Sequence, residues 1–81
     1  MNPRVKKVKT NSDFSLHLTF ENEEERIFDC SPYLGIGIFQ ELKDLNYFSK
    51  AFVQFGTVVW PHEQDFCPDT LYLDSIKIKS V

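Results

Sequence analysis

The stretch FSLHLTFE, residues 14–21, decides the fold, because apolar and polar side chains alternate along it without a break. Alternation with a period of two is typical of a β-strand that buries one face and exposes the other. The apolar positions are Phe14, Leu16, Leu18 and Phe20. The chain is therefore expected to contain a sheet with one buried face.

Turn signals on both sides of this stretch predict a meander of three antiparallel strands. Asn11-Ser12-Asp13 precedes the stretch and Asn22-Glu23-Glu24 follows it, and both triplets are rich in turn-forming residues. Pro32 ends the third strand, since proline cannot donate a hydrogen bond to a sheet. The expected strands are residues 4–10, 14–21 and 25–30.

The second half of the chain predicts one helix, a hairpin and a last strand. Apolar residues at i, i+4, i+8 and i+11 indicate a short amphipathic helix that begins near Gly37. These positions are Leu34, Ile38, Leu42 and Leu45. A hairpin is expected over 51–60 with its turn at Gly56, then an ordered loop over 62–73 and a strand over 75–79. The order β-β-β-α-β-β with an antiparallel sheet is α+β, in a single domain over 1–81.

Length and composition exclude several classes of protein. Eighty-one residues form one domain, and eight Phe, three Tyr and one Trp give it a folding composition. The uncharged stretch over 30–40 is too short and too broken by Pro and Gly to span a bilayer. The first residues lack the apolar core of a secretory signal, so two reduced cysteines and a cytoplasmic location are expected.

Charge is distributed unevenly. Residues 4–9 and 77–79 are basic, whereas acids dominate 21–25 and 63–69, and the net charge is −3. This balance disfavours binding to phosphate backbones, which needs many Lys and Arg contacts. Nucleic-acid binding through the basic terminal strands is therefore the weakest of the functional hypotheses. The acidic segments favour a basic protein partner instead.

Rare residue types gather in TVVWPHEQDFCPDTLY, residues 57–72. A metal- or ligand-binding module on the 60–72 loop is one hypothesis, because the loop carries zinc's usual ligand types. These residues are His62, Glu63, Asp65, Cys67 and Asp69. Their spacing matches no established zinc pattern, and the simpler interpretation is a turn in which the Asp side chains accept backbone N–H groups.

A nucleophilic cysteine is a second chemical hypothesis, with Cys30 or Cys67 served by His17 or His62. A reactive thiolate needs a nearby cation or a helix N-terminus, whereas Cys67 lies between acidic residues. No catalytic triad or phosphate-binding loop is present in the sequence. We therefore expect a protein that is not an enzyme, with no cofactor, metal or catalytic residue.

Trp60 is interpreted either as an interface anchor or as a core residue. The candidate interaction surface comprises Trp60, Pro61, Asp65, Asp69 and Tyr72. If these residues bind a partner, Trp60→Ala or Asp65→Lys should leave the fold intact and abolish the complex. An exposed first or last strand would also allow a homodimer.

The chain resembles the family known as domain of unknown function 2442 along most of its length. The matching segments are Leu16–Phe20, Arg26–Asp29, Phe39–Asp44 with Phe48, Gly56–Pro61, Asp65, Pro68-Asp69 and Leu71-Tyr72. The family usually has glycine in the turn after the second strand and again after Trp-Pro. Here Glu23 and Glu63 stand at those places, where a side chain has a steric penalty at positive φ, so either the turns differ or the loops are looser.

The resemblance implies a small bacterial α+β domain of the type found as the N-terminal half of a protein with a helix-turn-helix second half. These 81 residues show no resemblance to such a module, so DNA binding is not expected from the resemblance. The resemblance also implies two-gene cassettes with a protein of domain-of-unknown-function family 4160, and hence an antitoxin-like role. It brings no catalytic residues. The leading hypothesis is a non-enzymatic interaction domain that binds a small basic protein.

Overall fold

The protein is described by a computed structural model that covers residues 2–79. Its main feature is a four-stranded antiparallel sheet in the order β1-β2-β3-β6. The strands are β1 Val5–Thr10, β2 Ser15–Phe20, β3 Glu25–Asp29 and β6 Ile76–Lys79. The predicted meander and last strand are confirmed. A register shift between Val5 and Lys7 interrupts the pairing of β1 with β2.

The predicted hairpin is also confirmed, but it forms a second sheet of its own. Strands β4 Phe52–Gln54 and β5 Thr57–Val59 pair antiparallel. Phe55 and Gly56 form the turn between them, with φ values of 53° and 74°. Two positive φ values in a two-residue hairpin turn are characteristic of type I′. The backbone N–H of Val5 donates to the Gly56 carbonyl, which ties the turn to the start of β1.

A helix begins at Gly37 as predicted, but it is a 3-10 helix and not an amphipathic α-helix. The segment instead contains two 3-10 helices, η1 Ser31–Tyr33 and η2 Gly37–Lys43, followed by the short α1 Leu45–Phe48. Gly37 has φ 49° and Asp44 is extended, so the backbone leaves helical geometry at both places. Of the four apolar positions, Leu42 is fully buried, whereas Ile38 and Leu45 are 64% and 40% exposed. The apolar spacing therefore did not correspond to one buried helix face.

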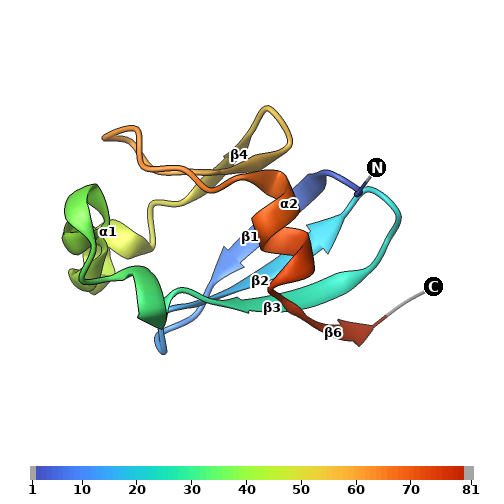
Figure 1. Ribbon diagram of the computed structural model, residues 1–81, viewed down its shortest axis with the longest axis horizontal. Coiled ribbons are helices and arrows are strands. Elements are labelled where there is room, and N and C mark those ends of the chain that lie inside the picture. Colours follow the sequence, from blue (N-terminus) through green and yellow to red (C-terminus); the bar gives the residue numbers. More distant parts are fainter. Residues whose placement is uncertain (1, 80–81) are drawn as a thin grey trace.

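The predicted loop over 62–73 contains a helix, α2 Pro68–Leu73. Pro68 occupies the first turn, where a missing N–H costs nothing, and Asp69 suits the positive end of the helix dipole. Both are helix-start signals that the sequence carried. Figure 1 shows α2 over one side of the sheet and residues 31–48 gathered at one end of the molecule.

The core lies between the sheet, the hairpin and the segments that cross over them. Leu16, Leu18 and Phe20 of β2 are fully buried, as the alternation predicts, and Phe28 of β3 joins them. The other buried apolar residues are Val5, Cys30, Leu42, Tyr47, Phe48, Val58, Trp60, Phe66 and Leu71. Ile27 of β3, which alternates with buried Phe28, pairs with Ile76 of β6.

Two glutamates adopt the left-handed conformation that usually favours glycine. Glu23 has φ 71° and Glu63 has φ 73°. A side chain in this region costs roughly 1 kcal/mol relative to a relaxed backbone. The turns expected to hold glycine thus keep the conformation that glycine favours, and glutamate accepts the strain.

Candidate interaction site

Trp60 does not belong to an interaction surface, because its side chain has no exposed area. Its indole Nε1 donates to the backbone carbonyl of Phe48 at 2.9 Å. Its ring lies 5.8 Å from that of Phe48 and 5.9 Å from that of Phe66. Pro61 follows and ends the hairpin. Because the indole is buried, Trp60 is a core residue.

A buried amide holds residues 60–66 against the helical segment. Gln64 is 2% exposed, and its side-chain oxygen accepts from the Tyr47 hydroxyl at 2.6 Å. Its side-chain nitrogen donates to the Ile38 carbonyl at 3.0 Å and to Glu41 Oε1 at 2.9 Å. The Tyr47 hydroxyl in turn accepts the backbone N–H of His62 at 2.8 Å. We call these five residues the Gln64 network.

His62 completes this network rather than a metal site. Its Nδ1 lies 2.7 Å from Glu41 Oε2, and its ring stacks on that of Tyr47 with centroids 5.0 Å apart. The hydrogen bond from His62 lowers the pKa of Glu41. Within residues 2–79, no three His, Cys, Asp or Glu side chains come together as a metal ion would require. The zinc hypothesis for the 60–72 loop therefore has no geometric support.

The thiols and the remaining histidine do not form a nucleophilic pair. Cys30 is fully buried, and desolvation, followed by the charge of Asp29, raises its pKa to about 12. Cys67 is exposed and directly precedes α2. His17 Nε2 lies 2.8 Å from Glu25 Oε1, on the face of the sheet away from the core. Both histidines are bonded to a glutamate, whereas Cys67 lies exposed at the N-cap of α2.

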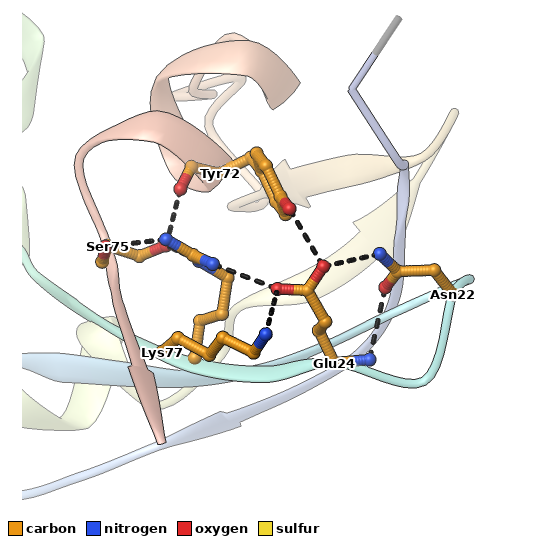
Figure 2. Close-up of polar contacts among 6 residues, drawn as sticks. Asn22, Glu24, Tyr72, Ser75 and Lys77 are labelled. Carbon is orange, nitrogen blue, oxygen red and sulfur yellow. Dashed lines mark hydrogen bonds and ion pairs between the residues drawn. The ribbon is translucent and has the colours of Figure 1, made fainter. Parts of the chain in front are cut away.

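A charged cluster joins the β2–β3 turn to α2 and β6, as Figure 2 shows. Glu24 is at its centre: its Oε2 accepts from the Tyr72 hydroxyl at 2.8 Å, and its Oε1 accepts from Arg26 Nη1 at 2.9 Å. Arg26 also donates to the side-chain and backbone oxygens of Ser75, at 2.7 and 3.0 Å. Asn22 and Lys77 complete the group, which we call the Glu24 cluster.

The Glu24 cluster is compact and internally satisfied. The side chains of Glu24 and Arg26 are each only 13% exposed, and the guanidinium lies 4.4 Å from the centre of the Tyr72 ring. The hydrogen bond from Tyr72 is the main cause of a lowered Glu24 pKa, and it raises the pKa of Tyr72 itself. Charge-assisted bonds of this kind fix geometry. The cluster therefore holds α2 and β6 in place against the sheet.

The cluster positions exposed apolar residues at the end of α2 and on β6, the strand at the edge of the sheet. Leu73 ends α2 and is 65% exposed, while Ile76 and Ile78 of β6 are 72% and 52% exposed. Among the described residues no strand pairs with the outer side of β6. We call Leu73, Ile76 and Ile78 the β6 strip. Sequence analysis assigned the strand but missed the strip, although the repeated Ile-Lys pattern was a signal for it.

The other members of the predicted surface are divided between two segments. Pro61 and Asp65 are exposed on the turn that precedes α2, and Asp65 forms a bridge with Val59. Asp69 is exposed on α2 and accepts from Asn2 Nδ2 at 3.3 Å. Tyr72, three residues further along α2, is half-buried in the Glu24 cluster. Asp69 and Tyr72 therefore lie on the same helix as Leu73 of the β6 strip, and of the two only Asp69 is exposed.

Comparison with known proteins identifies a family and no individual relative. No helix within residues 2–79 is long and apolar enough to cross a membrane. No curated protein and no solved structure matches the chain. A family model described as "Protein of unknown function (DUF2442)" matches residues 5–77, which is most of the 81-residue chain. By this match, and by the α+β fold that accompanies it, the chain belongs to the DUF2442 family.

Proposed function

We propose that the chain is a non-enzymatic, cytoplasmic protein-interaction domain that binds another protein through the β6 strip. The single observation that carries the proposal is the exposure of Leu73, Ile76 and Ile78 beside an unpaired strand edge. A free edge offers backbone N–H and C=O groups to an added strand. Exposed apolar side chains along it supply the burial that stabilises such a complex.

The other edge of the sheet is protected, which supports β6 as the binding edge. Lys6, Lys7 and Lys9 project from β1, and the register shift near Lys7 disrupts regular pairing. The start of β1 is also bonded to the hairpin turn through Val5. Lysines and bulges are the usual means by which proteins keep strand edges from associating. The β6 edge also carries lysines and a register shift in its pairing with β3, but Lys77 is turned to Glu24 and Ile76 and Ile78 stay exposed.

Charge supports a partner with basic residues next to its apolar strand. Asp69 and Asp74 are exposed at the two ends of α2, and Leu73 lies between them. Lys77 of the same edge is turned to Glu24, with Nζ 3.9 Å from Oε1. An antitoxin-like role, in which the partner is a small basic protein, is the specific form of this proposal. A homodimer would be the case in which the added strand is β6 of a second copy.

The experiment is a quantitative pull-down from the protein's own cells with two variants of identical chemistry. Ile76→Lys places a charge in the β6 strip, whereas Ile36→Lys changes a side chain that is 57% exposed at the far end of the molecule. We expect a partner that Ile36→Lys retains and Ile76→Lys loses, both variants keeping the melting temperature of the original protein. The mass of the complex separates a homodimer from a different partner. Equal recovery by both variants would contradict the proposal.

A further inference from the structure

Positive charge exceeds negative charge in the Glu24 cluster where it reaches the β6 edge. The two residues of a cross-strand pair point to the same face of a sheet. Arg26 pairs with Lys77, so both cations lie on one face, and both approach the carboxylate of Glu24. That carboxylate also accepts from Tyr72 and Asn22, which are neutral. Two cations and one carboxylate leave the group with a net positive charge.

Lys77 is the cation of this group that a partner can reach. Its side chain is 49% exposed, whereas that of Arg26 is 13% exposed. Its Nζ, drawn beside Glu24 in Figure 2, lies 3.9 Å from Oε1, which is longer than a hydrogen bond. The ammonium group therefore retains the capacity to donate to a second carboxylate. An acidic residue opposite Lys77 would stabilise an added strand, whereas a basic one would weaken the pairing.

The other face of β6 favours an apolar residue on the added strand. Ile76 pairs with Ile27 of β3 and is 72% exposed. An apolar side chain opposite Ile76 would extend the row of two isoleucines by one strand and cover the exposed one. Because Ile76 and Lys77 are consecutive, the residues opposite them are consecutive as well. The complementary strand therefore has an acidic residue next to an apolar one.

A negative charge lies at the junction of α2 and β6. Asp74 is exposed there, and within residues 2–79 its carboxylate forms no hydrogen bond or ion pair. All pairs in this sheet are antiparallel, and an antiparallel strand opposite Lys77 and Ile76 continues past this junction. A basic residue two positions after the apolar one would then lie beside Asp74. Complementary charges of both signs are thus required of one strand.

A second copy of the chain does not supply this pattern from its own sheet edges. β6 reads Ile-Lys-Ile-Lys and contains no acidic residue, and neither does β1, Val-Lys-Lys-Val-Lys-Thr. Pairing of two β6 strands would set an isoleucine or a lysine opposite Lys77. Charge complementarity therefore favours a strand from a different protein.

We propose that the strand bound at β6 belongs to a different protein and carries, in order, an acidic residue, an apolar residue and, two positions later, a basic residue. In antiparallel pairing these three lie opposite Lys77, Ile76 and Asp74. The inference rests on the proposed function, because it specifies the partner of the same edge. It also explains how a partner with basic residues tolerates a lysine on that edge, since its strand carries both charges.

The experiment is an NMR titration of the isotope-labelled protein with two synthetic peptides of identical composition, blocked at both ends. The first, Thr-Val-Glu-Ile-Thr-Arg-Thr, has the proposed order of charges, and in the second, Thr-Val-Arg-Ile-Thr-Glu-Thr, the two charges are exchanged. Amide shifts of β6 give the dissociation constant of each peptide. We expect the first peptide to bind roughly tenfold more tightly, because two cross-strand charge pairs are attractive in one complex and repulsive in the other.

Neutral variants test the two charges of the protein, and thermal melting checks that each variant folds. Lys77→Gln and Asp74→Asn should each reduce the preference between the peptides, and the double variant should lose it. Lys50→Gln combined with Glu21→Gln removes one charge of each sign from exposed residues elsewhere and should keep the full preference. Ile76→Lys should lose both peptides.

Equal affinity for the two peptides, tighter binding of the second, or no binding of either would overturn this inference. The proposed function survives those results as long as the pull-down yields a partner that Ile76→Lys loses. Peptide binding that Ile76→Lys leaves unchanged would contradict both, because the β6 edge would then not be the site.

Discussion

Residues 57–67 and residues 68–78 are adjacent in the sequence, but the fold uses them in opposite ways. The first segment turns its large side chains inward, with Trp60 at 0%, Gln64 at 2% and Phe66 at 5% exposure. The second leaves Leu73, Ile76 and Ile78 largely in solvent. Rare residue types therefore mark the segment that builds the core. Common aliphatic residues mark the segment that is available to a partner.

The largest expected effect on stability comes from truncating a core side chain in residues 57–67. Trp60→Ala should lower the free energy of unfolding by about 3–5 kcal/mol, because it removes a fully buried ring and leaves a cavity. Urea denaturation measures the change. Asp65→Lys, at an exposed residue of the same segment, is the control and should change stability by less than about 0.5 kcal/mol. Equal stability of Trp60→Ala and Asp65→Lys would mean that Trp60 does not act as a core residue of the first segment.

Gln64→Ala should have the next largest effect, a loss of about 2 kcal/mol, since it leaves buried polar groups unpaired. The Tyr47 hydroxyl would lose its acceptor, and the Ile38 carbonyl would lose a donor. His62→Ala removes a side chain that is 64% exposed, and its ion pair with Glu41 is worth less than about 1 kcal/mol. Urea denaturation should therefore give a lower midpoint for Gln64→Ala than for His62→Ala. Similar midpoints would mean that the ion pair stabilises the fold as much as the buried amide does.

The Glu24 cluster holds residues 68–78 against the sheet through charged groups, so lowering the pH should test its contribution to stability. The Glu24 pKa is lowered in the folded state, chiefly by the Tyr72 hydrogen bond. The stability that this carboxylate contributes is thus complete above its unfolded pKa near 4.5 and is lost as pH falls through the folded pKa.

Urea denaturation between pH 7 and pH 3 should show a smaller loss for Glu24→Gln than for the original protein. Glu21→Gln changes an exposed neighbour and should follow the original protein. Parallel curves for all three proteins would mean that the Glu24 cluster does not stabilise the fold through charge.

The smallest effect should be a gain of stability in each of the two strained turns. Glu63→Gly relieves a left-handed glutamate at φ 73° and should raise the free energy of unfolding by about 0.5 kcal/mol, after the entropy cost of glycine. Glu23→Gly should gain less, because it also removes the 2.8 Å ion pair with Lys6. Thermal melting compares the two variants, and destabilisation by Glu63→Gly would show that its side chain makes a stabilising contact.

The strands were predictable because their signals are local. The alternation corresponds to β2 Ser15–Phe20 with Leu16, Leu18 and Phe20 buried, whereas Phe14 lies before the strand with φ 64°. The glycine turn at 56 lies where the hairpin was expected. The start of α2 was also readable from Pro68 and Asp69. It was overlooked because the composition of residues 62–73 suggested a loop.

The helical segment and the interaction residues were not predictable, because they depend on distant contacts. Spacing alone could not show that Ile38 and Leu45 face solvent, since Gly37 and Asp44 redirect the backbone. The partners of Trp60 and Gln64 lie 12 and 17 residues away. The exposure of the β6 strip depends on where β6 pairs, and its partner strand is β3, about fifty residues earlier.

That pairing has a consequence for synthesis on the ribosome. Arg26 of β3 must wait for Ser75, 49 residues later, before its guanidinium is fully bonded. At about 5–20 residues per second, translation of the intervening chain takes several seconds. Until residues 76–79 are available to pair, β3 has no strand on its outer side. The nascent chain therefore offers a different edge from the finished protein, and a cognate strand present early enough would compete with β6 for its place.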